Sequence, residues 1–343
     1  MDGICPWSSD QPNPTTMSIK AEIIKKELTR FPKTPILTLS KKIYKANPKV
    51  FMDVESVRTL MRYYTGKQGV KNRKNAKEFA QAVTYDSNPF KLPESYAETF
   101  EPYIISQSKT LIISDLHFPY QDNKAITAAI KYGLKEQVTC ILINGDLLDF
   151  AGISRHERDW RQRSVFEEFE AVRKFLKMLR DKFPNAKIVF KEGNHDERWE
   201  KWLYVKAPEL FDDPEYKLEV RLRLGELKID IVKDRRPVKI GKLTVLHGHE
   251  MAGTSGGVNP ARSTFTKTLE SVLIGHFHKS SSHSESSMWG DLKVTESVGC
   301  LCGLHPQFMR VNKWNYGFAI VDLNIKTGEY QVGNYKIIDG KVY

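Results

Sequence analysis

Beyond residue 114, five short clusters of aspartate, histidine and asparagine each directly follow an apolar run of residues. In chain order the clusters are D-L-H at 115–117, G-D-L-L-D at 145–149, G-N-H-D at 193–196, H-G-H at 247–249 and G-H-F-H at 275–278. Carboxylate, imidazole and amide groups without a thiolate suit divalent ions such as Mn²⁺, Zn²⁺ or Fe²⁺. The set exceeds the needs of one ion, whereas two ions about 3.5–4 Å apart would use it and activate a nucleophile toward phosphorus.

The apolar runs before these clusters predict five strands, because they are short and rich in β-branched residues. They cover residues 110–114, 138–144, 187–191, 243–246 and 271–274. Residues 164–182 predict a helix, which a capping box of Ser164 and Glu167 opens. Ligand sites in open α/β sheets form at the carboxyl ends of strands, so the five clusters are expected to converge. Shorter β-like runs after Gly290 suggest a second sheet.

The order of the five motifs resembles the calcineurin-like metallophosphoesterase superfamily, over roughly residues 109–343. The resemblance implies an α/β fold, a four-layer α-β-β-α sandwich. It also implies a first metal held by Asp115, His117, Asp146 and His278, and a second held by Asp146, Asn194, His247 and His276, with Asp146 bridging. We expect two divalent ions, with Mn²⁺ as the first choice and Zn²⁺, Fe²⁺ or Ni²⁺ as alternatives.

Two residues of the third motif gain catalytic roles from the same resemblance. The histidine that matches His195 faces the substrate and protonates the leaving oxygen, and Asp196 would orient it or tune its pKa. Asp149 is expected to support a ligand or to order the loop. For His249 the roles of ligand, support for a ligand and local structure all stay open.

A run of arginines lies between the second and third motifs, at Arg155, Arg158, Arg161 and Arg163. The run must lie near the centre, because Asp146 and Asp149 precede it closely. Arginine pairs with phosphate oxygens in a bidentate manner, so this run is a candidate substrate-phosphate site. A solvated loop in which arginines alternate with Glu157 and Asp159 is an equally good interpretation.

The N-terminal region has a different chemistry. Residues 18–82 contain sixteen Lys and Arg against five Asp and Glu, which accounts for the whole net charge of +11. Residues 19–30, 37–46 and 54–64 predict three short helices, the third capped by Asp53. This pattern favours a helix-turn-helix-like DNA-binding module, with candidate contacts at Arg58, Arg62, Tyr63 and Lys67. A solvated bundle that docks on protein is the alternative.

These patterns predict a chain with four parts. A flexible tail covers residues 1–17, a basic all-α domain 18–70, a linker 71–108 and the metallophosphoesterase domain 109–343. Residues 1–17 lack the apolar stretch of about 7–15 residues that a signal peptide requires. No run approaches the roughly 18 apolar residues of a membrane span, so no membrane partner is expected.

The cysteines favour a cytoplasmic location. Cys140 lies in an apolar run, and Cys300 and Cys302 are too close in sequence to close a useful disulfide loop. A reducing compartment is therefore the simpler interpretation. A zinc site on Cys300 and Cys302 is the alternative to ordinary packing, although no second cysteine pair supports it.

The leading functional hypothesis is a dinuclear-metal phosphodiesterase or nuclease that acts on nucleic acid or nucleotides and carries a DNA-binding module. The Ser/Thr protein phosphatases of the superfamily have Arg and Glu where this chain has Phe150 and Asp196, and the motifs look more like its DNA-repair nucleases. The combination of domains also resembles phage and prophage members. One alternative is a phosphatase for a phosphoprotein or small monoester, with the N-terminal module docking protein. Another is a DNA-binding regulatory protein with a structural metal site.

Overall fold

The computed structural model describes residues 17–32, 34–65, 90–93, 100–154, 164–251, 253 and 256–343. Contacts divide the chain into two compact units, Met1–Ala97 and Glu98–Tyr343. The predicted tail, apart from Met17, and most of the predicted linker lie outside the described residues. Among the described residues, no helix has both the length and the apolar character required to cross a bilayer.

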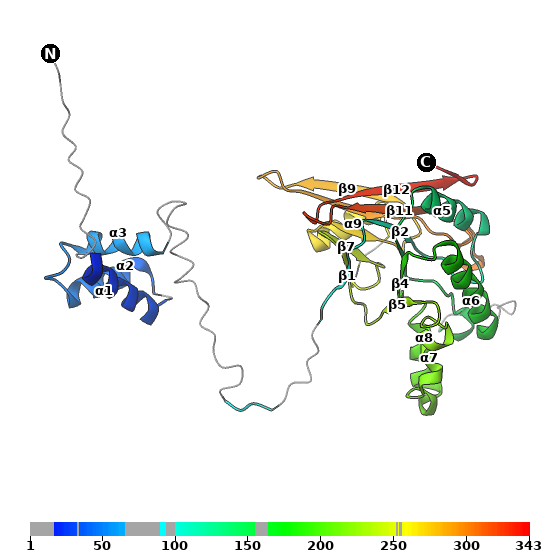
Figure 1. Cartoon of the computed structure of the whole chain (residues 1–343), viewed down its shortest axis with the longest axis horizontal. Helices are drawn as coiled ribbons and strands as arrows, with labels where there is room; N and C mark the ends of the chain where they lie inside the picture. Colours follow the sequence, from blue (N-terminus) through cyan, green and yellow to red (C-terminus); the bar gives the residue numbers. More distant parts are fainter. Residues whose placement is uncertain are drawn as a thin grey trace, which may run out of the picture. The chain divides into compact units, whose positions relative to one another are not determined.

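Within residues 17–32 and 34–65, the N-terminal unit contains three helices (Figure 1, blue). They are α1 at Met17–Arg30, α2 at Ile36–Ala46 and α3 at Val54–Tyr64. Their apolar faces share a core that includes Ile24, Leu39 and Val57. α3 begins where the sequence predicts, because the Asp53 carboxylate accepts a hydrogen bond from the Ser56 amide at 2.6 Å. The unit therefore has a core of its own.

In the described part of the second unit, the strands form two sheets. The first sheet has the strand order β13-β12-β11-β2-β3-β4-β5. Its parallel part consists of β2 (Lys109–Ile113), β3 (Cys140–Asn144), β4 (Lys187–Lys191) and β5 (Ile229–Val232). Antiparallel strands extend it beyond β2, namely β11 (Tyr316–Leu323), β12 (Tyr330–Ile338) and β13 (Lys341–Val342).

The second sheet has the order β1-β6-β7-β8-β10-β9. Its strands are β1 (Tyr103–Ile105), β6 (Val238–Ile240), β7 (Leu243–Leu246), β8 (Val272–Ile274), β9 (Ser281–Ser286) and β10 (Leu292–Ser297). The pairs β1–β6, β7–β8 and β8–β10 are parallel, and the pairs β6–β7 and β10–β9 are antiparallel. β7 and β8 thus point their carboxyl ends the same way.

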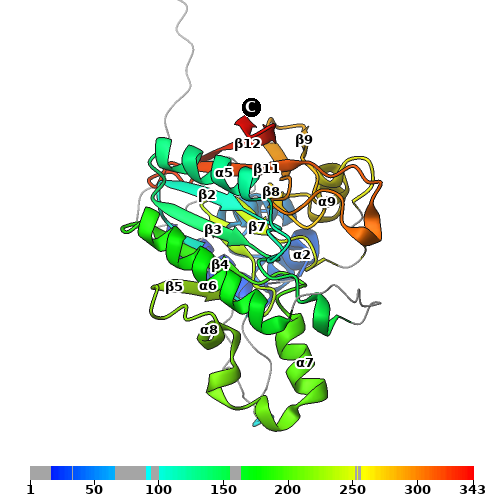
Figure 2. The same ribbon diagram turned by 90° about the vertical axis from the view of Figure 1, so that its right-hand side faces the viewer.

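Helices cover the outer faces of the two sheets. α5 (Asn123–Lys135) and α6 (Val165–Lys182) lie across β2, β3 and β4 (Figure 2), and α7 (Arg198–Lys206) and α8 (Leu218–Arg221) follow β4 in the chain. α9 (Pro260–Thr268) contacts β8, β9 and β10. Leu111 packs in the core beneath α5 and α6, whereas the next residue, Ile112, packs with Val245 of β7 between the sheets. The predicted four-layer α-β-β-α sandwich is confirmed.

Two sequence predictions about the strands are wrong. The residues after Gly290 do not form a sheet of their own, since β10 joins the second sheet while β11 and β12 extend the first. The end of the predicted linker 71–108 forms β1, in which Tyr103 pairs with Val238 of β6. Apolar alternation indicates which side of a strand is buried but does not encode its neighbour, so sequence alone misassigned these strands.

Candidate metal centre

The predicted ligands converge at the carboxyl ends of strands from both sheets. Asp115, Asp146 and Asn194 follow β2, β3 and β4 of the first sheet, while His247 and His276 follow β7 and β8 of the second. His278 Nε2 lies 3.1 Å from Asp115 Oδ1 and 3.2 Å from His117 Nε2. His247 Nε2 lies 3.2 Å from Asp146 Oδ2. The centre therefore forms only when the two sheets pack together.

Two overlapping groups of ligand atoms fit two ions. In each group the ligand atoms lie within 4.8 Å of one another, and the groups are Asp115, His117 and Asp146 on one side and Asp146, His247 and His276 on the other. Asp146 belongs to both, as a bridging carboxylate must. Asp115 Oδ1, Asn194 Oδ1 and His247 Nε2 are buried and make no well-directed hydrogen bond to the described residues, although His278 Nε2 lies 3.1 Å from the first and Asp146 Oδ2 3.2 Å from the third. Buried polar atoms without partners are costly, and cations at this position would satisfy all three.

The backbone supports the same interpretation. Five of the candidate ligands have a positive φ, a conformation that costs about 1–3 kcal/mol for residues other than glycine. Their values are 56° for Asp115, 48° for His117, 52° for Asp146, 66° for His276 and 55° for His278. These five are among fourteen described non-glycine residues with positive φ, and at the five the unusual backbone directs candidate ligand side chains to one centre.

The buried carboxylates make this centre favourable for cations. Burial opposes their ionisation, but neighbouring imidazoles outweigh it and lower the pKa of both Asp115 and Asp146. Burial alone would lower the pKa of His247, but the charge of Asp146 raises it to about 10. Burial lowers the pKa of His276 to about 4. Divalent ions bound here would replace the protons, because metal ligands must be deprotonated.

Hydrogen bonds at Nδ1 orient two of the imidazoles, those of His247 and His117, so that they present Nε2 to the centre. His247 Nδ1 lies 2.8 Å from the carbonyl oxygen of Asn144. His117 Nδ1 lies 2.9 Å from Asp149 Oδ1, which agrees with the supporting role predicted for this carboxylate. A bond at Nδ1 fixes the tautomer and the ring plane of a metal-binding histidine.

Both cysteine side chains lie close to the candidate ligand His278. Cys302 Sγ lies 3.8 Å from His278 Nδ1, whereas Cys300 Sγ is directed to the carbonyl oxygen of Asn315 at 3.8 Å. Within the described residues, no candidate ligand group contains both cysteines, and Cys302 joins one with His117 and His278. The alternative of a separate zinc site on the pair therefore gains no support.

His195 lies beside the ligands, held by contacts that differ from the prediction. Its amide donates to Asp146 Oδ1 at 2.9 Å, and its Nδ1 lies 3.2 Å from Asp149 Oδ1 and 2.9 Å from the Asp149 carbonyl. An Arg198 guanidinium nitrogen lies 3.0 Å from His195 Nε2. The sequence analysis did not predict this contact. The sequence did contain one signal for it, because Arg198 lies three residues after His195 at the start of a helix.

The Asp196 carboxylate bonds backbone amides and not the His195 ring, which differs from the orienting role expected for it, while the expected influence on the pKa of His195 stays a prediction. The Asp196 carboxylate is fully buried and accepts hydrogen bonds from the amides of Gly193 at 2.8 Å and Leu148 at 3.0 Å. Burial and the charge of Asp146 raise the pKa of Asp196 to about 7, while these amide bonds oppose the rise. Asp196 therefore ties the loop after β4 to the loop after β3. A short acidic side chain bonds a backbone amide a few residues away, here that of Gly193, more easily than it bonds the ring of the adjacent residue.

Two ionic contacts connect the H-G-H loop to the first sheet. His249 Nε2 lies 2.8 Å from Glu197 Oε1, which makes His249 a support of the loop and leaves it outside the candidate ligand groups. The Glu250 carboxylate accepts hydrogen bonds from the amides of His247 and Gly248, and it lies 2.9 Å from Lys191 Nζ of β4. Lys191 is fully buried.

The Lys191–Glu250 pair is expected to contribute strongly to stability. Lys191→Met should lower the free energy of unfolding by about 3–5 kcal/mol, because it leaves the buried Glu250 charge without its partner. Urea unfolding followed by tryptophan fluorescence in excess chelator measures this. Lys293→Met is the matched control, since Lys293 and Glu270 form an exposed pair with side chains 40% and 62% accessible, worth less than about 1 kcal/mol. Equal losses in both variants would contradict the assignment.

A methyl group at Gly193 is expected to disturb the centre. A Cβ there would lie 2.3 Å from Asp146 Oδ1 and 2.4 Å from the Asp146 amide nitrogen. Gly193→Ala should therefore displace Asp146 and lower Mn²⁺ affinity by roughly 10–100-fold, as measured by titration calorimetry. Gly225→Ala is the control, because a Cβ at that position meets nothing within 4 Å. Unchanged affinity in Gly193→Ala would show that Asp146 does not bind the metal.

The remaining candidates lie elsewhere. Arg58 and Arg62 of α3 lie 3.1 Å and 3.8 Å from Glu55, and Tyr63 packs edge-on against Tyr64. Lys67 and the four predicted phosphate-binding arginines, Arg155, Arg158, Arg161 and Arg163, lie outside the described residues.

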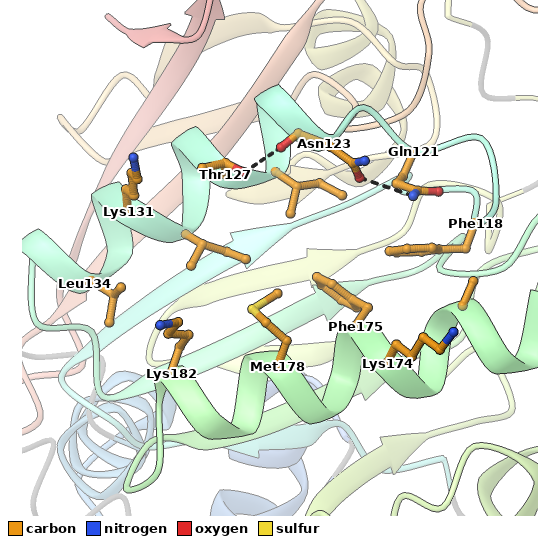
Figure 3. A pocket seen from close by; sticks show the side chains of 13 residues that line it. Phe118, Gln121, Asn123, Thr127, Lys131, Leu134, Lys174, Phe175, Met178 and Lys182 are labelled. Atoms are coloured by element: carbon orange, nitrogen blue, oxygen red, sulfur yellow. Dashed lines mark hydrogen bonds between the residues drawn. The ribbon is translucent and has the colours of Figure 1, made fainter.

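An apolar cavity lies between α5 and α6, away from the candidate ligands. It has a volume of 660 Å³ and is lined by side chains such as Phe118, Ile130 and Phe175, with Lys131 and Lys174 among the polar residues (Figure 3). None of the candidate metal ligands lines this cavity. The candidate metal centre therefore lies at the strand ends and not in this cavity.

Residues 108–315, more than half of the chain, match the family described as calcineurin-like phosphoesterase. The chain belongs to this family of metal-dependent phosphoester hydrolases. It is similar to the Gene 54 protein of Mycobacterium phage L5, with 25% identity over 252 residues that cover 68% of this chain and 98% of that protein. The Gene 54 protein of Mycobacterium phage D29 is 27% identical over 252 residues, with the same coverage of 68% and 98%.

Solved structures also match this chain, at low sequence identity. Vacuolar Protein Sorting 29 from Cryptosporidium parvum is 16% identical, with a TM-score of 0.38 and coverage of 69% of this chain and 95% of that chain. YfcE, a phosphoesterase from E. coli, is 13% identical, with a TM-score of 0.32 and coverage of 66% and 98%.

Proposed function

We propose that this chain is a two-metal phosphodiesterase that acts on nucleic acid or nucleotides. The observation that carries the proposal is the pair of ligand groups that share Asp146, with His195 beside them. Two divalent ions bound there would polarise the phosphate and activate water for attack. The same site chemistry also serves phosphomonoesters, so the choice of a diester rests on further features of the chain.

His195 is the proposed general acid. Its amide donates a hydrogen bond to Asp146 Oδ1, which fixes the residue at the centre, and its Nδ1 contact with Asp149 leaves Nε2 on the other side of the ring from that carboxylate. Arg198, 3.0 Å from Nε2, is placed to pair with a phosphate oxygen when an ester binds. When Arg198 turns to the phosphate, His195 Nε2 can take up a proton from solvent and then deliver it to the leaving oxygen.

Two features support nucleic acid as the source of the ester. The motifs at residues 115–117, 145–149 and 193–196 have the forms that resemble DNA-repair nucleases of the superfamily. Residues 18–82, in the N-terminal unit, contain sixteen Lys and Arg against five Asp and Glu. This positive charge suits contact with a phosphate backbone. Tethering such a module to the catalytic unit raises the local concentration of nucleic acid.

Hydrolysis of two simple esters tests the chemistry. We expect Mn²⁺-dependent turnover of bis-p-nitrophenyl phosphate that exceeds turnover of p-nitrophenyl phosphate. Greater turnover of the monoester would favour a phosphatase. Absence of turnover of both esters with Mn²⁺, Zn²⁺, Fe²⁺ and Ni²⁺, despite stoichiometric bound metal, would contradict the proposed catalysis and favour a regulatory protein with a structural site.

Salt-dependent binding tests the N-terminal module in the full chain. Combined substitution of Arg58, Arg62 and Lys67 by alanine should weaken binding to duplex DNA and reduce the slope of log affinity against log salt, by up to about 0.9 per lost phosphate contact. Lys326→Ala, which changes an exposed lysine of the catalytic unit, is the control. An unchanged salt slope in the triple variant would favour a protein-docking role for this unit.

A further inference from the structure

The segment between β10 and β11 presents large apolar side chains to solvent. Phe308 is 78% exposed and Val311 is 95% exposed. They belong to residues 303–315, which include the short 3₁₀ turn Gln307–Met309. Exposed apolar side chains that gather in one segment can mark a binding surface.

Internal hydrogen bonds give this loop a defined shape. The Asn312 side chain donates from Nδ2 to the carbonyl oxygens of Leu304 at 2.6 Å and Met309 at 2.8 Å. Its Oδ1 accepts a hydrogen bond from the Trp314 amide at 2.9 Å. One side chain thus joins the beginning, middle and end of the loop, so the outward direction of Phe308 is built into the fold.

The loop adjoins the metal centre through aromatic contacts. The Trp314 ring lies 4.0 Å from the ring of His278, a candidate metal ligand, and 6.4 Å from the ring of Phe308. The Asn315 amide donates to the His278 carbonyl at 3.0 Å. A row of rings therefore extends from the ligand set to the exposed surface. A base stacked on Phe308 would therefore be separated from the candidate ligand His278 by the Trp314 ring.

The charge of the loop is positive throughout. Residues 303–315 read GLHPQFMRVNKWN, with Arg310 and Lys313 and no acidic residue, and both basic residues are exposed. A loop that combines exposed aromatic and basic side chains suits an anionic polymer with flat apolar groups. Single-stranded nucleic acid has this chemistry, since its bases stack on aromatic rings while its phosphates pair with Arg and Lys.

We propose that residues 303–315 form a platform for unpaired bases of single-stranded nucleic acid at the metal centre. Phe308 stacks on a base next to the phosphodiester that is cleaved, and Arg310 and Lys313 contact neighbouring phosphates. In duplex DNA the bases are stacked on one another, so the platform selects single strands or frayed ends. The inference rests on the proposed diester activity and specifies its substrate.

Cleavage of a single-stranded oligonucleotide by the full chain with Mn²⁺ tests the platform. Phe308→Ala should lower kcat/KM for the oligonucleotide by roughly tenfold or more, since each stacked base depends on its ring. Phe308→Trp should restore it. Turnover of bis-p-nitrophenyl phosphate should fall much less than oligonucleotide cleavage in Phe308→Ala, because this small ester has no neighbouring nucleotide that reaches from the cleaved phosphate to Phe308. Ile325→Ala, which changes an apolar residue 63% exposed between β11 and β12, is the control.

Photo-crosslinking gives a second measurement that needs no turnover. An oligonucleotide containing 5-iodouracil, irradiated with the full chain in chelator, should crosslink to residues within 303–315, as located by peptide mass spectrometry. Equal oligonucleotide cleavage by wild type and Phe308→Ala overturns the platform and leaves the proposed diester chemistry in place. If wild type hydrolyses no diester, crosslinks outside 303–315 overturn the platform as well, and crosslinks within it support nucleic-acid binding without cleavage.

Discussion

Asp146→Asn is expected to lower the rate of Mn²⁺-dependent hydrolysis at least about 100-fold and to reduce the bound metal below two ions per chain. Asp146 is the carboxylate shared by both ligand groups, and its Oδ2 lies 3.2 Å from His247 Nε2 and 3.6 Å from His117 Nε2. A neutral amide lacks the charge needed to bridge two cations. The change preserves the size of the side chain, so the fold should persist.

Metal analysis by mass spectrometry and hydrolysis of bis-p-nitrophenyl phosphate measure the two parts of this result. Asp291→Asn, at an exposed position before β10, is the matched control and should bind metal and turn over as wild type. Two ions per chain in Asp146→Asn, with turnover preserved, would remove Asp146 from the centre. Metal preserved with turnover lost would assign it a role in catalysis and not in binding.

His195→Ala is expected to have an effect that depends on the leaving group. A general acid contributes about 10²–10⁴-fold when the leaving oxygen needs a proton, as the sugar oxygen of a nucleotide does. p-Nitrophenolate leaves readily without a proton at neutral pH, so its esters should lose much less. Bound metal should be unchanged, since His195 is connected to Asp146 through its amide and not its ring.

Two roles of His195, proton donation and phosphate binding, can be separated by hydrolysis rates. The rates of wild type and His195→Ala are compared for a dinucleotide and for bis-p-nitrophenyl phosphate. A large loss on the dinucleotide alone supports proton donation. Equal large losses on both esters would point to phosphate binding by the ring, and no loss on either would exclude His195 from the reaction. Asp149→Asn should reproduce part of the effect, because this carboxylate lies 3.2 Å from His195 Nδ1.

Local patterns in the chain predicted much of the centre. Asp115, Asp146 and His247 each stand immediately or almost immediately after an apolar run, and strand ends of this kind converge in α/β folds. Asp53 at the start of α3 was predictable for the same reason, since a cap depends on residues three positions apart. Contacts between neighbours in sequence follow from residue type and spacing.

Contacts between segments far apart in the chain were harder to predict from the sequence. Asp196 was expected beside His195, but packing placed the Asp149 carboxylate there and directed Asp196 to backbone amides. Arg198 reached His195 only because α7 begins at this point and in this direction. Several partners compete for each polar side chain, and only the folded arrangement determines which one is nearest.

By itself, the sequence determined the ligand types, the basic N-terminal helices and the class of metal chemistry, because these depend on composition and on short spacings. Tertiary structure decided that β7 and β8 belong to a different sheet from β2, β3 and β4, so that the centre lies where two sheets meet. It also decided that Trp314 lies against His278, with Phe308 exposed beyond it. Hydrogen bonding between strands and packing between layers join residues far apart in the chain, and apolar periodicity carries no information about which of them meet.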